Sequence, residues 1–321
     1  MIVRWGLTEL DGVLAELGVK RSFLVASPRW APGVRLTGVW TEIPSDRIQE
    51  VVERAIGSEA DNVLAMGGGS AIDLAKAISA ETGLPLVSVP TTYSGAEWTP
   101  GFGIRDRDRR MKGGGSGAKL AAIVYDPELT LSLPRAETVG TAMNALDHTA
   151  EALYVKGRND EGDREALAGA RLIGDWLPRV VESPDGLEAR RRLLEGAMHA
   201  GAALASAGLG LAHAMAQALG GRYGLPHGAL NAITLPPTLR FNEPVASAEI
   251  ARFGEALGTD DAAARVEQLA LLGGYKRLRD LGVPENELTE VAEAAAGRPG
   301  ARANPRSATP SQVLDLLQSV Y

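Results

Sequence analysis

Cysteine is absent from this chain of 321 residues. Without thiols, the chain cannot form disulfides, thiolate nucleophiles, iron–sulfur clusters or cysteine-based zinc sites. It also has no run of about 18 uncharged apolar residues, which argues against a membrane span. The first residues contain no apolar core of a signal peptide, so we expect a cytoplasmic protein. Only four histidines are present, which makes the position of each one informative.

An excess of basic residues is also missing. The formal net charge is −7 and the calculated pI is about 5.3. A nucleic-acid-binding chain needs a basic face, so no nucleic-acid partner is expected. Apolar residues make up 45% of the composition, which is enough to bury the core of one large domain or two ordinary ones.

Short β-type runs alternate with helical patterns over the first ~135 residues. Strands are predicted at residues 22–26, 38–43, 62–66 and 86–90, and helices at 45–52, with Ser45 as N-cap, and 71–78. This order predicts an α/β domain with a parallel, Rossmann-like sheet. The charged run 105–110 is interpreted as a solvated hairpin or loop rather than a functional patch.

Helical spacing dominates the second half of the chain. Residues 136–155, 160–180, 185–223 and 260–320 are rich in Ala, Leu, Glu and Arg, and no comparable strand candidate appears among them. We therefore predict two domains, a dinucleotide-binding α/β domain at residues 1–137 and an all-helical catalytic domain at 138–321.

A run of glycines lies where a predicted strand meets a helix. Gly67, Gly68, Gly69 and Ser70 would let a ligand approach the backbone at a helix N-terminus, where N–H groups and the helix dipole favour phosphate. The alternative is that the turn needs glycine for its geometry alone. The run matches neither the usual Rossmann fingerprint nor a Walker A motif.

Hydroxyl side chains follow the next strand. Thr91, Thr92 and Ser94 come after its predicted carboxyl end, where parallel sheets bind ligands. They could equally cap a following helix.

Three of the four histidines lie in the helical half with polar neighbours. Asn144 and His148 are four residues apart, as are His213 and Gln217, so each pair shares a helix face. His227 follows a turn at Pro226. A lone helical histidine is usually a packing residue, but this grouping favours a convergent site. His199 lacks such a partner and is interpreted as a structural or surface residue.

These segments resemble the iron-containing alcohol dehydrogenase superfamily, and most closely its maleylacetate reductase branch. The resemblance extends over essentially the whole chain. The segments that carry it are residues 67–76, 90–100, 124–130, 143–154, 219–227 and 304–306.

The resemblance implies a nucleotide-binding domain and a helical domain, with the reaction between them. Asp73, Glu97 and Lys112, together with the glycines and hydroxyls above, are then expected to bind NAD(P)H. His148, His213 and His227 match three metal ligands of metal-dependent members, and Asn144 stands at the position of their aspartate. A neutral amide does not offset the charge of a dication, so no tightly bound metal is expected.

The expected reaction is hydride transfer from NAD(P)H to an unsaturated or carbonyl carbon of an oxo-acid. The three histidines, with Asn144 and Gln217 beside them, would stabilise the developing enolate or alkoxide, and one ring would supply a proton. Gln217, Ala229 and Asn231 depart from the reductase branch, which leaves the substrate open.

The basic residues of the sequence bear on the charge of the substrate and on the choice between NADH and NADPH. A dicarboxylate would need a cationic clamp, for which the candidates are Lys112, Arg222, Arg240 and Arg306. Arg29 follows the first predicted strand without a nearby carboxylate, so NADPH should be tolerated and NADH is not excluded.

Three alternatives stay open on the sequence alone. The first is a metal-dependent alcohol or polyol dehydrogenase with iron or zinc held by the three histidines. The second is a lyase like 3-dehydroquinate synthase, whose Lys- and Arg-rich motifs are not evident. The third is a nucleotide-binding protein without turnover. A homodimer is expected from the family only.

Overall fold

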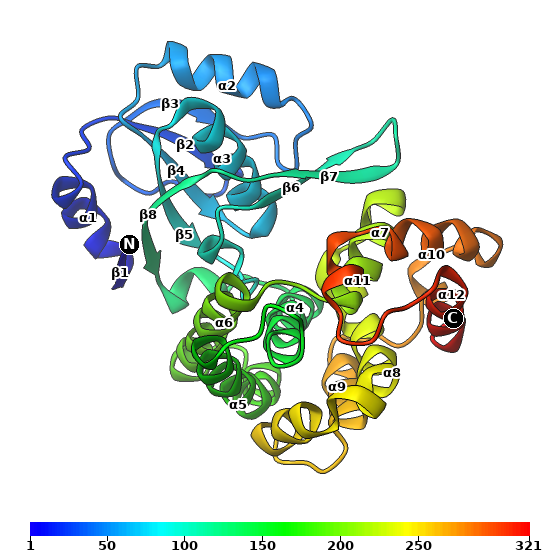
Figure 1. Cartoon of the computed structure of the whole chain (residues 1–321). Helices are drawn as coiled ribbons and strands as arrows, with labels where there is room; N and C mark the ends of the chain where they lie inside the picture. The colour runs from blue at the N-terminus through cyan, green and yellow to red at the C-terminus, as the bar shows by residue number, and fades with distance from the viewer. The chain divides into compact units, whose positions relative to one another are not determined.

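The computed structural model describes residues 1–321, which form two compact units (Figure 1). The sheet unit comprises Met1–Thr92, Ala96–Asp106 and Gly113–Ser132. The helical unit comprises Tyr93–Gly95, Arg107–Lys112 and Leu133–Tyr321. Each unit contains its own hydrophobic core, and each is described separately below.

The sheet unit is built on six parallel strands. They are β1 (Ile2–Trp5), β2 (Ser22–Ala26), β3 (Leu36–Trp40), β4 (Asn62–Gly67), β5 (Pro85–Pro90) and β8 (Lys119–Tyr125). Their order across the sheet is β1-β8-β5-β4-β2-β3, and every neighbouring pair is parallel. The unit also contains the helices α1 (Leu10–Glu16), α2 (Ile48–Gly57) and α3 (Gly69–Thr82). This confirms the predicted α/β class with a parallel sheet.

Both faces of this sheet are covered, which explains its continuous apolar strands. In β2, Phe23 and Val25 pack with residues of α2 and α3, whereas Leu24 and Ala26 pack with residues of α1. Successive side chains of a strand point to opposite faces, so a strand buried on both sides has no polar alternation.

The strand predictions were incomplete, because two strands at one edge of the sheet were missed. Strands β1 and β8 were not predicted, and β3 begins and ends earlier than the predicted 38–43. The prediction of Ser45 as an N-cap was wrong: α2 begins at Ile48, and the Ser45 hydroxyl accepts from the backbone N–H of Arg47 at 3.3 Å. Serine commonly makes such a local turn outside a helix.

A two-stranded hairpin, β6 (Phe102–Asp106) and β7 (Met111–Gly115), carries the charged run 105–110 at its tip. Short 3₁₀ turns complete the connections. They are Leu7–Glu9, Ala96–Trp98, Pro127–Thr130, Arg279–Leu281 and Glu285–Glu287.

The helical unit contains nine α-helices. They are α4 (Arg135–Ala152), α5 (Asp160–Glu182), α6 (Leu187–Ala207), α7 (Leu211–Tyr223), α8 (His227–Ala256), α9 (Ala262–Leu271), α10 (Leu288–Ala296), α11 (Pro299–Ala303) and α12 (Pro310–Ser319). Helix α8 was not predicted because Pro236, Pro237 and Pro244 lie inside it. Proline lowers helix propensity strongly, but Pro236 and Pro237 are buried within the helix, whereas exposed Pro244 lies two residues before a kink at Ala246.

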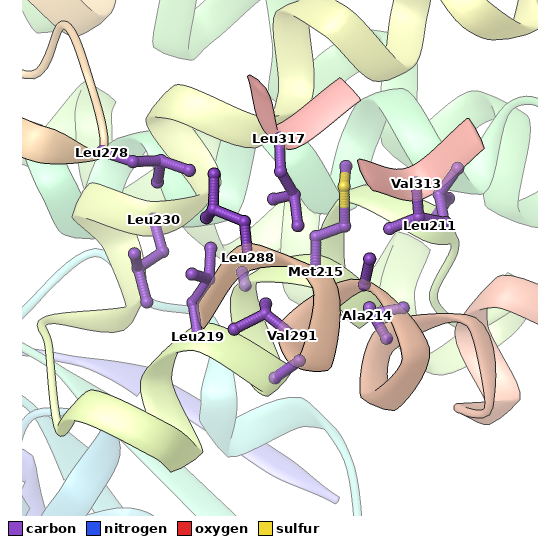
Figure 2. Close-up of a cluster of buried hydrophobic side chains, with 14 of the residues drawn as sticks. Leu211, Ala214, Met215, Leu219, Leu230, Leu278, Leu288, Val291, Val313 and Leu317 are labelled. Carbon is purple, nitrogen blue, oxygen red and sulfur yellow. The ribbon is translucent and has the colours of Figure 1, made fainter. Parts of the chain in front are cut away.

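A core of aliphatic side chains fixes α7 among its neighbours. Leu211, Met215 and Leu219 of α7 face side chains from α8, α10 and α12, among them Leu288 and Leu317 (Figure 2). This packing sets the orientation of the opposite, polar face of α7, on which His213 lies.

No single helix combines the length and the apolar composition needed to cross a membrane. The one combination that meets both criteria is α6 with α7, and this pair is bent by 102° at its junction.

Candidate functional site

The glycine run lies at the topological switch point of the sheet unit. From β2 the chain moves outward to β3, whereas from β4 it moves the other way to β5, so the direction reverses between β2 and β4. Ligands of open α/β sheets bind outside the carboxyl ends of strands at such a point. Gly67 ends β4, and Gly68 is the N-cap of α3, whose N-terminus has no side-chain cap.

Two threonines border this turn. The backbone N–H of Thr91 donates to the Gly67 carbonyl at 3.0 Å, and the Thr92 methyl would lie only 2.8 Å from a Cβ on Gly68. The Thr91 hydroxyl is buried and has no hydrogen-bond partner in the chain. A buried polar atom without a partner is uncommon and is consistent with a polar ligand at this turn.

Asp73 and Glu97, predicted to bind the cofactor, have partners within the sheet unit. Asp73 accepts from the N–H of Gly103 at 3.2 Å and pairs with buried Lys76 at 3.5 Å. Glu97 accepts from the Tyr125 hydroxyl at 2.6 Å. Burial raises the pKa of Glu97 despite that hydrogen bond. The structure thus places both carboxylates in internal networks.

In the helical unit, α4 carries a polar stripe through an apolar helix. Asn144, Asp147, His148 and Glu151 stand at positions i, i+3, i+4 and i+7, and all four are buried. This spacing places them on one face of the helix. Buried polar groups require partners, so this face is committed to specific contacts.

Glu151 joins α4 to the N-terminus of α7. Its carboxylate accepts from the backbone N–H groups of Gly210 at 2.6 Å and Ala212 at 2.8 Å. It also contacts Nδ1 of His213 at 2.8 Å, and Asp147 lies 3.1 Å from the same nitrogen. Two carboxylates therefore hold one edge of the His213 ring.

The other edge of the ring faces two amides. Nε2 of His213 lies 3.3 Å from Oδ1 of Asn144 and 2.7 Å from Nδ2 of Asn231. The Asn144 amide also donates to the carbonyl of Ser94 at 2.8 Å. Ser94, predicted to bind the cofactor, thus positions Asn144 through its backbone.

The three predicted histidines come together in the helical unit. The rings of His148 and His213 stack, with centroids 4.7 Å apart and an interplanar angle of 17°. The His227 ring is tilted, and its centroid lies 5.6 Å from that of His213. His148 and His213 are buried, whereas His227, the first residue of α8, is half-buried.

Electrostatics separate the roles of these rings. Burial alone would lower the pKa of His213, but the charges and hydrogen bonds of Asp147 and Glu151 outweigh it and raise that pKa to about 10. Burial raises the pKa of Asp147 to about 7. Burial and the charges of Lys112, His213, His148 and Arg298 hold the pKa of His227 well below its ordinary value. One ring is thus favoured as a cation and another as a neutral imidazole.

Two features of the three-histidine group disfavour a divalent metal there. The amide nitrogen of Asn231 lies opposite the ring nitrogen of His213 that a metal would need, and Asn144 supplies no charge. The group of three ligand atoms that does lie within 4.8 Å of one another is Asp147, Glu151 and His213. There the Glu151 oxygens already accept from backbone N–H groups and Nδ1.

The remaining predicted residue, Gln217, lies one turn after His213 on α7. Its Oε1 accepts from Nη1 of Arg298 at 3.1 Å, and Nη2 of Arg298 lies 3.5 Å from the Lys112 carbonyl. The charges of Lys112 and Arg298 both act on His227. Arg298 was not predicted from the sequence.

The other clamp candidates have structural partners. Arg222 pairs with Glu287 at 2.6 Å and Arg240 with Glu267 at 2.7 Å, while Arg306 stacks on Phe241. His199 contacts Glu165 at 2.7 Å, and both are partly exposed.

Sequence reasoning passed over Asp147 and Glu151 as functional residues, although a signal for both was available. Polar residues that recur every three or four positions in a helix rich in Ala predict a buried polar face. No comparable pattern marks Arg298, because it follows α10 and precedes the short α11.

Comparison with known families decides the relationship. Residues 5–127 match the family model described as iron-containing alcohol dehydrogenase, and residues 138–321 match the C-terminal model of the same family. The chain belongs to the iron-containing alcohol dehydrogenase family. This membership confirms the predicted resemblance, and it identifies the chain as an NAD(P)H-dependent oxidoreductase.

Within the iron-containing alcohol dehydrogenase family, the similarity is to the maleylacetate reductases. The chain is 36% identical to maleylacetate reductase of Burkholderia cepacia over 98% of its length and 93% of that protein. It is 36% identical to maleylacetate reductase 1 of Rhodococcus opacus over 82% of its length and 74% of that protein. The crystal structure of maleylacetate reductase from Agrobacterium tumefaciens has a TM-score of 0.89 and 30% identity, covering 100% of this chain and 95% of that one.

Proposed function

We propose that this protein reduces maleylacetate or a closely related unsaturated oxo-dicarboxylate with NAD(P)H, and that it does so without a metal. The observation that carries the proposal is the buried His213 ring, held by Asp147 and Glu151 on one edge and facing two amides on the other. The similarity to maleylacetate reductases over nearly the whole chain supports the substrate class.

We propose that the cofactor's pyrophosphate binds at Gly67, Gly68, Gly69 and Ser70, beside the hydroxyls of Thr91 and Thr92. The uncapped N-terminus of α3 and the buried Thr91 hydroxyl without a partner support this position. NAD(P)H, when bound, supplies a hydride to the alkene carbon β to the ketone. Exposed Arg29, which follows β2, favours tolerance of the 2′-phosphate of NADPH.

His213 would supply the positive charge that a metal supplies in other members. As the alkene carbon accepts the hydride, the electron pair moves onto the ketone oxygen and forms an enolate. A fixed imidazolium stabilises that developing charge, and a histidine then gives a proton to the neighbouring carbon. The products are the saturated oxo-acid and NAD(P)⁺. The Asn231 carbonyl can face the protonated Nε2 after a half-turn of its amide.

His227 would act differently from His213. Its lowered pKa keeps the ring neutral near neutral pH, so its single N–H can donate a hydrogen bond to the substrate oxygen. It is also the most exposed of the three rings, which suits direct contact with a substrate.

The proposal is tested by measuring NADPH and NADH oxidation with maleylacetate, short aldehydes and keto-acids. We expect turnover of maleylacetate and at most weak turnover of the aldehydes. The opposite preference would contradict the substrate assignment.

Metal dependence is the second candidate, and the cluster of Asp147, Glu151 and His213 is the observation that favours it. Elemental analysis of protein purified without added metal separates the two. We expect far less than one metal ion per chain and unchanged activity after treatment with a chelator. Stoichiometric iron or zinc, with activity lost on chelation, would instead identify a metal-dependent alcohol or polyol dehydrogenase.

A further inference from the structure

Arg298 is a half-buried arginine of the helical unit that no carboxylate contacts, and its buried Nε has no hydrogen-bond partner. Arg222 and Arg252, by contrast, each contact an acidic side chain. Arg298 instead donates to the amide oxygen of Gln217 and weakly to the carbonyl of Lys112. Both partners are neutral, so the positive charge is not balanced within the chain.

The surroundings of Arg298 make that imbalance unfavourable in the free protein. Burial lowers the pKa of the guanidinium, and its Nε is buried without a hydrogen-bond partner. A guanidinium has five N–H groups, and only two find partners here. A partly desolvated cation with unused donors is stabilised when an anion binds beside it.

The position of Arg298 connects it to the histidine cluster. Gln217, which holds its Nη1, lies one turn after His213 on the same helix. The charges of Arg298 and Lys112 both act on His227 and lower the pKa of that ring. An anion bound by Arg298 would therefore lie near the ring that we propose to contact the substrate oxygen.

We propose that Arg298, positioned by Gln217 and assisted by Lys112, binds a carboxylate of the substrate and thereby selects oxo-acids over neutral carbonyl compounds. This inference rests on the proposed function and adds the residue that recognises the acid. A guanidinium binds a carboxylate with charge-assisted hydrogen bonds in a fixed plane, which gives orientation as well as affinity.

The test compares Arg298→Gln and Arg298→Lys with Arg302→Gln. Arg302 is a matched control because it is an exposed arginine of the adjacent α11 whose hydrogen bond goes to the Gly297 carbonyl. The assays are the kcat and KM for maleylacetate, and the binding of adipate and of its uncharged diamide to the full-length protein. Adipate binding reports on carboxylate recognition even without turnover.

We expect Arg298→Gln to weaken adipate binding and raise the KM roughly 10- to 100-fold, while kcat changes little. Arg298→Lys should recover part of the loss, because it restores charge but not the planar geometry. Binding of the diamide, the affinity for NAD(P)H and the melting temperature should stay unchanged in every variant.

Three results separate this inference from its alternatives. Adipate affinity within about twofold of wild type in Arg298→Gln would overturn it. A loss of NADPH affinity alone would overturn it too, and would assign Arg298 to a cofactor phosphate. Adipate binding that depends on Arg298, in a protein that fails to reduce maleylacetate, would uphold the carboxylate site and refute the proposed function.

Discussion

Replacing Glu151 with glutamine tests whether the carboxylates control His213. The substitution preserves the shape of the side chain but removes a charge that is fully buried. In the native protein this carboxylate accepts from three backbone N–H groups at the start of α7, those of Gly210, Ala212 and His213, and it contacts the His213 ring. The single glutamine oxygen can replace only one of the two carboxylate oxygens, so the variant loses the charge pairing with the ring and also leaves one or more backbone N–H groups without an acceptor.

The expected loss of stability follows from that pairing. Breaking a buried ion pair by removing one partner typically costs about 3–5 kcal/mol. Asp147 lies 3.1 Å from the same ring nitrogen and retains part of the interaction. We therefore expect Glu151→Gln to lower the free energy of unfolding by about 3 kcal/mol, the low end of that range.

The effect on activity follows from the proton on Nδ1. If the glutamine turns its NH₂ toward the ring, Nδ1 must accept rather than donate, and the cationic form is disfavoured. Disturbing the carboxylate that orients a catalytic histidine in this way can lower kcat by about 10²- to 10⁴-fold. The pKa of His213 should fall, because a charge that raises it has been removed.

The measurements are urea unfolding, NAD(P)H oxidation and titration of the ring by NMR. Glu165→Gln is the matched control, since Glu165 contacts His199 at 2.7 Å in a partly exposed pair. Exposed pairs contribute little, so this control should change stability by less than about 1 kcal/mol and leave kcat unaltered. A Glu151→Gln protein with wild-type stability and wild-type kcat would refute the proposed role of the carboxylate.

Two further outcomes are expected. Gly68→Val should weaken NAD(P)H binding at least about tenfold, because the valine side chain would meet Thr92 and fill the turn. The control Gly57→Ala places its methyl group in open space and should leave binding unchanged, and fluorescence titration measures both affinities. The free energy of unfolding should fall as the pH rises from neutral toward about 10, because His213 stays protonated in the folded chain over that range but not in the unfolded chain. Urea unfolding at several pH values should show a weaker decline for Glu151→Gln than for the wild type. An equal dependence on pH in the two proteins would contradict the raised pKa of His213.

The family motifs predicted more of this protein than local periodicity did. The glycine run between β4 and α3 identified the strand-to-helix turn, and the sheet order then placed that turn at a switch point. Periodicity failed at α8, a 30-residue helix that contains three prolines and is kinked at Ala246. Burial of that helix among its neighbours outweighs the local preference, and no window of sequence contains that information.

The candidate site, too, was predicted only in part from the sequence. The placement of Asn144 and His148 on one helix face could be deduced from the sequence, as could that of His213 and Gln217, but the contact of His213 with Asn231 could not. The contact of Glu151 with His213 joins residues 62 positions apart, and that of Arg298 with Gln217 joins residues 81 positions apart. Both depend on how whole helices pack.

The sequence by itself determined the parallel α/β class, the helical second half and the family, because these follow from patterns that repeat within short segments. Tertiary structure alone decided that one histidine is held between two carboxylates and two amides, and that an arginine beside the cluster has no acidic partner. The reason is physical: charge state depends on desolvation and on neighbours within a few ångströms, and folding brings those neighbours from distant parts of the chain.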